Sequence, residues 1–263
     1  MPRNHIIISG TGRAGTTFLV QLLTELGLDT GFKDPYEQIY TNANAGMEKD
    51  ILAQDAPYIV KSPWLSDNLG NLIDEGGIVI DCAIIPIRDL YSAAESRRDV
   101  MRREESKKYN SNGVPGGLVH TANPDDQEFF LMNQFYHIVY DLIDHDVPTV
   151  FLHFPRLVMD VEYLYSKLFP LFKFEDKRTF IEAFKKLSKP ELVHSFESNL
   201  AESHKIKPVN FLLENRKLMG EMELYRKYYE NIVTSQSYKV GHLLTFPLRK
   251  LKALKKRLFP GKI

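Results

Sequence analysis

Short apolar runs alternate along the chain with longer segments in which apolar residues recur every three or four positions. The short runs are rich in β-branched residues, which is typical of buried strands. They occupy residues 5–9 (HIIIS), 58–60, 78–87 (IVIDCAIIPI) and 149–153 (TVFLH). The longer segments predict helices. They cover residues 16–27, 36–42, 64–73, 90–105, 125–144, 158–169, 176–186 and 209–235.

This order of elements predicts the fold class. A strand that is followed by a helix and then by a parallel strand leaves helices on both faces of one sheet. We therefore expect a three-layer α/β fold with a central parallel β-sheet and a helical C-terminal part. No linker interrupts the pattern before residue 235, so one domain is expected over residues 1–235.

Residues 236–263 form a basic amphipathic tail. Leucines recur at three- or four-residue steps from Leu244 to Leu258, with Lys and Arg between them. The whole chain has 34 basic and 34 acidic residues, but residues 231–263 contain eight basic residues and no acidic one. The first 230 residues therefore hold 26 basic against 34 acidic residues, a net charge of −8. Such a tail either lies on an anionic membrane surface or packs on its own acidic body.

Composition narrows the class of protein further. Nucleic acid is not expected as a partner, because the body is acidic and the tail lacks interleaved aromatic residues. A single cysteine, Cys82, excludes a disulfide framework and a multi-cysteine zinc site. No stretch of about 18 apolar residues occurs, and the apolar start is too short for a signal peptide. We expect a cytoplasmic protein, peripheral at the inner membrane surface if the tail binds lipid.

The segment after the first predicted strand is suited to bind an anion. It reads Gly10-Thr11-Gly12-Arg13-Ala14-Gly15-Thr16-Thr17 and leads directly into a helix. The glycines allow a tight turn that points N–H groups inward, and the helix start adds partial positive charge. The spacing is that of a P-loop-type phosphate loop, but Thr16 stands where nucleotide triphosphatases have a lysine. The alternative is a tight strand–helix turn that binds no ligand.

Residues 12–18 (GRAGTTF) resemble the 5′-phosphosulfate loop of the PAPS-dependent sulfotransferases, closest in style to the bacterial and glycan O-sulfotransferases. The resemblance implies PAPS (3′-phosphoadenosine 5′-phosphosulfate) as sulfuryl donor, PAP as product, no metal, and a binding loop of Gly12, Arg13, Ala14, Gly15, Thr16 and Thr17. Arg13 stands where that family usually has a lysine. Family members read the 3′ phosphate with an arginine at a strand end and a serine eight residues later, and Arg88 and Ser96 match this spacing. The alternative is a helix cap at Arg88 and a surface serine.

Two weaker resemblances agree with the first. Lys61-Ser62-Pro63-Trp64 follows a short predicted strand and is similar to a segment of glycan O-sulfotransferases whose lysine lies near the sulfuryl group. Residues 150–169 are similar to a strand-plus-helix pattern common in the superfamily. The matches together span residues 6 to about 169, and the Arg-Lys-Gly segment of the cytosolic small-molecule enzymes is absent.

Sulfuryl transfer needs cations over the leaving oxygens and a base for the acceptor proton. Arg13 and Lys61 are the candidate cations. Glycan O-sulfotransferases have a glutamate about twenty residues after the loop cation, and this resemblance makes Glu37 the first candidate base and Asp34 the second. Each is equally compatible with a solvated loop carboxylate. His153 and His120 are weaker alternatives.

The arginines of the helix after Arg88 allow two interpretations. Arg97, Arg98, Arg102 and Arg103 alternate with acidic residues, which favours a solvated charged face. The other interpretation is that Arg97 or Arg98 helps to hold the cofactor or an acidic acceptor.

The prediction that follows is a sulfotransferase that moves a sulfuryl group from PAPS to a hydroxyl of a carbohydrate or glycolipid. A P-loop kinase is the first alternative, because residues 78–81 (IVID) resemble a Walker-B strand. A non-catalytic adaptor that binds a nucleotide or a membrane is the second.

Overall fold

The computed structural model describes most of residues 2–193. The described residues are 2–40, 43–62, 65, 68–105, 116–118, 121, 123–193, 226, 227 and 230. The chain divides into two compact units, Met1–Glu197 and Ser198–Ile263. In the second unit, Arg226 and Glu230 form an ion pair one helical turn apart, with 3.3 Å between Nε and Oε1. The rest of the predicted helix 209–235, the predicted boundary at residue 235 and the basic tail lie outside the described residues.

A four-stranded parallel sheet forms the centre of the first unit. Its order is β4 (Ile59–Lys61), β1 (Arg3–Ile8), β5 (Ile78–Ile87) and β6 (Thr149–His153). In register, Ile8 of β1 lies beside Lys61 of β4 and beside Ile84 of β5. Because all four strands run the same way, their carboxyl ends share one edge, and the loops that follow them meet there.

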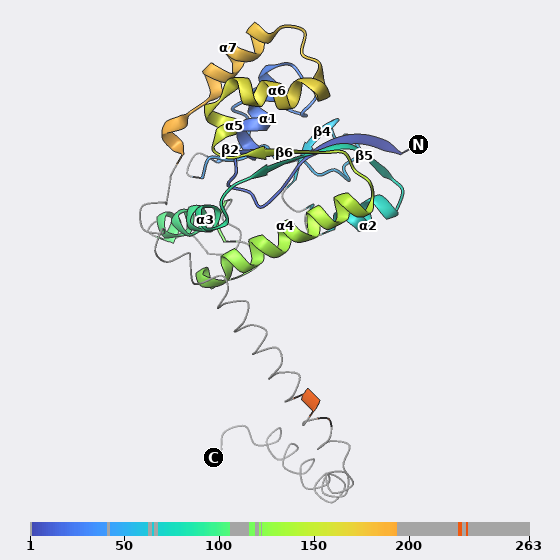
Figure 1. Ribbon diagram of the computed structural model, residues 1–263, viewed down its shortest axis with the longest axis vertical. Helices are drawn as coiled ribbons and strands as arrows, with labels where there is room; N and C mark the ends of the chain where they lie inside the picture. Colours follow the sequence, from blue (N-terminus) through green and yellow to red (C-terminus); the bar gives the residue numbers. More distant parts are fainter. Residues whose placement is uncertain are drawn as a thin grey trace, which may run out of the picture. The chain divides into compact units, whose positions relative to one another are not determined.

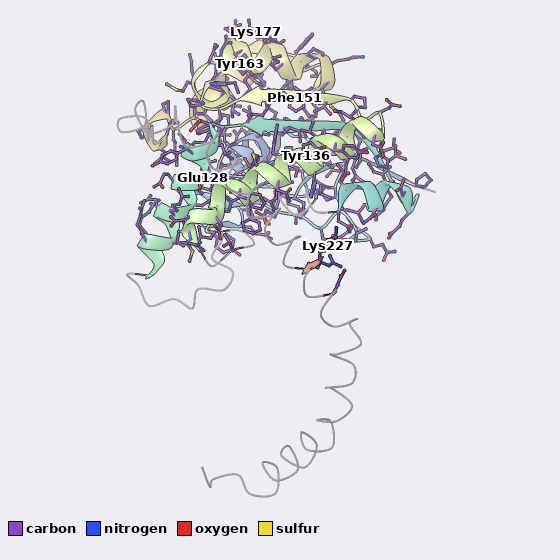
Figure 2. All side chains as sticks on the ribbon, turned by 60° about the horizontal axis from the view of Figure 1, so that its bottom comes forward. Glu128, Tyr136, Phe151, Tyr163, Lys177 and Lys227 are labelled. Carbon is purple, nitrogen blue, oxygen red and sulfur yellow. The ribbon has the colours of Figure 1, made fainter. Side chains whose placement is uncertain are left out.

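Helices cover both faces of this sheet, which confirms the predicted three-layer α/β class (Figure 1). One layer contains α1 (Thr16–Glu25), α5 (Arg156–Met159), α6 (Val161–Phe172) and α7 (Lys177–Leu187). The other contains α2 (Leu69–Asp74) and α4 (Gln127–Asp144). In Figure 2, Phe151 of β6 lies between Tyr163 on the α6 side and Tyr136 on the α4 side.

The alternating side chains of β1 show why both layers are needed. Ile6 and Ile8 point into a buried cluster with Leu19, whereas Ile7 points into a second cluster with Leu142. Each of the three isoleucines is at most 1% exposed. Burying such a side chain stabilises the fold by about 1.5–3 kcal/mol, so a strand that is apolar on both faces requires two covering layers.

The third predicted strand and the helix after it occur at the predicted positions. β5 spans Ile78–Ile87, and α3 spans Leu90–Glu105. The buried positions Ala93, Arg97 and Val100 repeat at four- and three-residue steps, so they share one face of α3. On that face, Ala93 packs in a cluster with Leu131 of α4, and Arg97 reaches Thr11 in the loop after β1.

Three local predictions differ from the structure. The expected helix 36–42 is not present over its described residues 36–40, where a turn leads into the short hairpin of β2 (Ile39–Tyr40) and β3 (Ala45–Gly46). The predicted helix 158–169 is two helices, because Asp160 is extended and its carboxylate caps α6 by accepting from Tyr163 N. The sequence also suggests Asp125 or Asp126 as the cap of the helix 125–144, but the side-chain cap is Asn123, at the short 3-10 helix η2 (Pro124–Asp126) before α4.

Candidate active site

The loop between β1 and α1 has the backbone of an anion cradle. Gly10, Gly12, Arg13 and Gly15 all have positive φ angles, between 55° and 129°. At Gly15, φ is 86°, and a Cβ there would lie 3.0 Å from Leu157 Cδ1. Only glycine adopts this conformation readily in so little space, so the tight turn depends on that residue.

The N–H groups of this loop are open to a ligand. Within the described residues, the backbone N–H groups of residues 12–18 donate no hydrogen bond to another part of the chain. The first N–H groups of a helix lack intrahelical partners and carry a partial positive charge. The segment from Gly12 to Thr17 can therefore surround a phosphate, as the sequence predicts.

Arg13 connects the loop to the two residues matched to the 3′-phosphate pair. Arg13 Nε donates to Ser96 Oγ at 3.0 Å, and Arg88 Nη1 donates to the Arg13 carbonyl oxygen at 3.0 Å. Arg13 Nη1 also donates to the Ala43 carbonyl oxygen. Arg88 lies over the ring of Phe154, with its Cζ 4.9 Å from the ring centre. The fold thus brings Arg88 and Ser96, eight positions apart in sequence, to the same cavity.

Lys61 lies on the other side of the loop. Its Nζ donates to Thr17 Oγ1 at 3.0 Å and to the Gly46 carbonyl oxygen at 2.5 Å. Glu48 Oε1 is 3.5 Å from the same atom. Lys61 is only 5% exposed, and burial lowers its pKa although Glu48 acts in the opposite direction. An anion in the loop would therefore lie near a buried cation whose nearest carboxylate among the described residues is that of Glu48.

For Arg97, the favoured interpretation as part of a solvated charged face was wrong. Its Nη2 donates to the Thr11 carbonyl oxygen at 2.7 Å and its Nη1 to the Gly117 carbonyl oxygen at 2.6 Å. Within the described residues its Nε has no hydrogen-bond partner. Burial, and then the nearby Arg13, lower its pKa to about 9, so it stays charged at neutral pH. The interpretation failed because Arg97 occupies the buried face of α3.

The solvated-face interpretation fits the neighbours of Arg97. Arg98 pairs with Glu95 and Glu128, Arg102 with Glu95, and Arg103 with Asp99. Each arginine has a carboxylate within one or two helical turns or on α4, as charged groups at helix surfaces commonly do. Arg103 nevertheless also lines the cavity.

The cavity beside the loop has a volume of about 620 Å³ and is strongly cationic. Its described lining includes six basic residues, namely Arg13, Lys61, Arg88, Arg97, Arg103 and Lys189, but a single carboxylate, Glu48. Burial lowers the pKa of Arg13 and of Arg88 to about 10, which reflects the free-energy cost of burying their charge. A polyanionic ligand would offset that cost.

The two predicted carboxylate bases do not line this cavity. Asp34 and Glu37 are exposed in the turn before β2. Asp34 Oδ1 accepts from Tyr36 N, and Glu37 Oε2 accepts from Lys33 N, so both carboxylates are used to stabilise the turn. His153 is also exposed and outside the lining, and His120 lies outside the described residues.

The remaining predicted binding residues lie around the cavity. Gly12, Gly15, Thr16 and Thr17 line it together with Arg13, Arg88 and Ser96, whereas Ala14 is fully buried beneath the loop. Sequence reasoning missed Glu48 and Phe154. No local motif marks either residue, but the 93–97–100 spacing on α3 was a signal that Arg97 faces inward.

Asp81, the candidate Walker-B aspartate, lies away from the loop. It occupies the first half of β5, whereas the phosphate loop follows the carboxyl end of β1. Its two oxygens accept hydrogen bonds from Asn4 Nδ2 at 2.7 Å and from Tyr58 Oη at 2.8 Å. Asp81 is therefore not placed to hold a metal ion next to the phosphate loop, as the kinase alternative requires of a Walker-B aspartate.

The described residues contain neither a cluster of metal ligands nor a membrane-spanning helix. In that part of the chain, no group of three or more His, Cys, Asp or Glu side chains is placed to hold a metal ion. No helix in the same part is long and apolar enough to cross a membrane.

Comparisons with known proteins gave one structural match. No family model matches the sequence, and no curated protein matches it. Among solved structures, the chain matches the sulfotransferase domain of the olefin synthase from Synechococcus PCC 7002. The match covers 72% of this chain and 82% of that domain, with 15% sequence identity and a TM-score of 0.42.

Proposed function

We propose that this protein is a sulfotransferase that uses PAPS as its sulfuryl donor. The observation that carries the proposal is the loop of residues 12–18, whose backbone N–H groups donate no hydrogen bond within the described residues. Arg13, Lys61 and Arg88 flank this loop, and position 16 is a threonine. A triphosphatase needs a lysine at that position to reach the outer phosphates. A ligand with one anionic group in the loop and another near Arg88 and Ser96 fits these residues.

The roles of the binding residues follow from their positions. PAPS supplies an SO3 group joined through oxygen to its 5′ phosphate, with a second phosphate at the 3′ position. The N–H groups of Gly12 to Thr17 hold the 5′ phosphate, and Arg88 with Ser96 holds the 3′ phosphate. Arg13 and Lys61 stabilise the negative charge that develops on the leaving oxygen, as fixed cations in a site of low water content do.

Glu48 is the base that this geometry favours. Its carboxylate lines the cavity and lies 3.5 Å from Lys61 Nζ. During transfer, the sulfur–oxygen bond to the 5′ phosphate breaks, the acceptor oxygen bonds to sulfur, and the acceptor proton passes to a carboxylate. Asp34 and Glu37 remain predictions from sequence for that last role. The acceptor in the proposal is a hydroxyl of a carbohydrate or glycolipid.

The cell compartment and the tail belong to the same proposal. We place the enzyme in the cytoplasm, with residues 236–263 as a peripheral contact to an anionic inner membrane surface. Support comes from the eight basic residues after position 230 and from the leucines spaced between them. A glycolipid acceptor would be found at such a surface.

Nucleotide binding tests the proposal. Titration with PAP and with ATP–Mg should show tight binding of PAP alone, and a preference for ATP–Mg would overturn the proposal. In Arg88→Ala, the ratio of PAP affinity to 5′-AMP affinity should fall about ten- to a hundredfold, because a charge-assisted bond to the 3′ phosphate is lost. The ratio is the decisive quantity, since Arg88 also holds the Arg13 carbonyl and its removal weakens both ligands. An unchanged ratio would remove Arg88 from the 3′-phosphate site.

A further inference from the structure

The basic residues described above line one part of the cavity, and apolar residues line another part. This apolar wall consists of Tyr36, Ile39, Tyr40, Val158, Leu192 and Val193. Its members come from the turn and hairpin after α1, from α5, and from the segment after α7 that includes η3 (Pro190–Leu192). Apolar residues distant in sequence thus line the same cavity as the phosphate loop.

Large parts of the apolar wall are exposed. Tyr40 is 58% exposed, Tyr36 50% and Leu192 42%. Behind them, Phe18 and Leu187 are buried and belong to the core cluster. Exposed apolar side chains that gather on one cavity, with a packed core behind them, are typical of a surface that an apolar ligand covers.

Few polar groups interrupt the apolar wall. Gln21 Nε2 is already used, because it donates to the Pro35 carbonyl oxygen at 2.8 Å. Asn44, between β2 and β3, and Lys189, between α7 and η3, are further polar residues of the lining. A fully polar oligosaccharide would place hydroxyl groups against the aliphatic members Ile39, Val158, Leu192 and Val193, whose side chains offer no hydrogen-bond partner, and this costs free energy.

The wall begins next to the reactive end of the cavity. Thr17 contacts Lys61, and Gln21 lies one helical turn further along α1 on the same face. A molecule that reaches Glu48 and Lys61 with a hydroxyl group can therefore extend its remaining part along the apolar wall.

From this juxtaposition we infer that the acceptor is amphipathic: a hydroxyl-bearing sugar head with an apolar body, as in a glycolipid. The inference rests on the proposed sulfotransferase function and narrows it, because it excludes free oligosaccharides as the preferred acceptors. The head lies at Glu48 and Lys61, and the apolar body covers Tyr36, Tyr40 and Leu192.

Methyl and octyl β-glucosides form a matched pair of probes, since their sugar heads are the same. Calorimetric titration of the full-length protein, with and without saturating PAP and below the micelle concentration, measures their affinities. Each buried CH2 group improves binding about fourfold, so octyl glucoside should bind at least about tenfold more tightly than methyl glucoside. Equal affinities would overturn the inference.

Tyr40→Ser and Tyr136→Ser separate the apolar wall from nonspecific adsorption. Tyr136 is 64% exposed on α4 and does not line the cavity, so it is the matched control (Figure 2). Tyr40→Ser should weaken octyl glucoside about tenfold and leave PAP binding unchanged, while Tyr136→Ser should change neither. Equal effects of the two variants on octyl glucoside would place its binding outside the cavity and contradict the inference.

The PAP and glucoside titrations distinguish failure of the sulfotransferase proposal from failure of the inference about the acceptor. Failure to bind PAP overturns the sulfotransferase proposal, whatever the glucosides do. Octyl glucoside binding in the absence of PAP still tests the apolar wall in that case. If PAP binds and octyl glucoside shows no preference over methyl glucoside, only the inference about the acceptor fails.

Discussion

At the scale of single residues, the cations of the site share one property: most of their hydrogen bonds go to neutral oxygens. Arg13 donates to a serine and a carbonyl group, Arg97 to two carbonyl groups, and Lys61 to a threonine and a carbonyl group. Such bonds satisfy the donors but do not offset the positive charge, and among the described residues only Lys61 of these three has a carboxylate partner, Glu48 at 3.5 Å. The site therefore keeps the electrostatic attraction that a bound anion would use.

The role of Glu48 as general base gives a prediction at the scale of a single residue. Glu48→Gln should lower the rate of transfer of radiolabelled sulfate from PAPS to a cell-envelope extract by about a hundredfold or more, because a general base is lost. PAP affinity should not fall, since the change removes a negative charge from the described lining of the cavity and leaves its cations in place. Glu37→Gln, a matched change at the exposed turn, should leave the rate near that of the unaltered protein. A large loss in Glu37→Gln and none in Glu48→Gln would return the role of base to the residue that the sequence favours.

At the scale of elements, the two faces of α3 have different roles. Its outer face carries Arg98 and Arg102 in ion pairs with acidic residues, and its inner face places Ser96 and Arg97 at the phosphate loop. A helix repeats every 3.6 residues, so neighbouring arginines in the sequence point to different environments. Charge alone did not reveal which arginine faces inward.

Two arginines on α3 offer a matched test of that division. Arg97→Met should reduce the rise in melting temperature that PAP causes, because the change removes a buried cation and the two bonds that hold Thr11 and Gly117 in place. Arg97→Lys should restore part of that rise, since it keeps the charge but loses the forked geometry. Arg102→Met makes the same change in net charge at a residue whose side chain is 61% exposed. Thermal unfolding with and without PAP should show the loss in Arg97→Met alone, and equal losses would remove Arg97 from the site.

The accuracy of prediction differed between elements for a physical reason. β5, β6 and α3 were predicted at the residues where they occur, since long apolar runs and regular spacing leave little alternative. The region 36–47 was predicted poorly. Its hairpin depends on the left-handed backbone at Gln38 and Asn44, for which the sequence gives no strong turn signal.

At the scale of the whole molecule, charge is divided between the cavity, the body and the tail. The first 230 residues carry a net charge of −8, yet the cavity lining is basic. An acidic body therefore does not oppose an anionic donor, because interactions within a few ångströms dominate over charges screened by solvent.

Membrane binding by the tail is the prediction at this scale. The full-length protein should bind phosphatidylglycerol vesicles and not phosphatidylcholine vesicles in a sedimentation assay, and added salt should weaken the binding. Neutralising Lys252, Lys255 and Lys256 together should weaken it by up to about fivefold per residue. Neutralising Lys167, Lys173 and Lys185, three exposed lysines of the body, is the control. Equal losses in the two triple variants, or equal binding to both lipids, would contradict the prediction.

The sequence by itself determined the layers of this protein and the position of its anion loop. Apolar periodicity marks the strands and helices, and glycines before a helix mark a loop with open N–H groups, because both signals are local. The tertiary structure alone decided which side chains face that loop. Glu48 follows the β2–β3 hairpin, which Lys61 at the end of β4 contacts through the Gly46 carbonyl oxygen, and Arg97 lies on α3, which starts after the carboxyl end of β5. The two residues share one cavity because β4 and β5 end at the same edge of the sheet as β1. Burial, and not residue type, made Arg97 part of the site and left Glu37 outside the cavity.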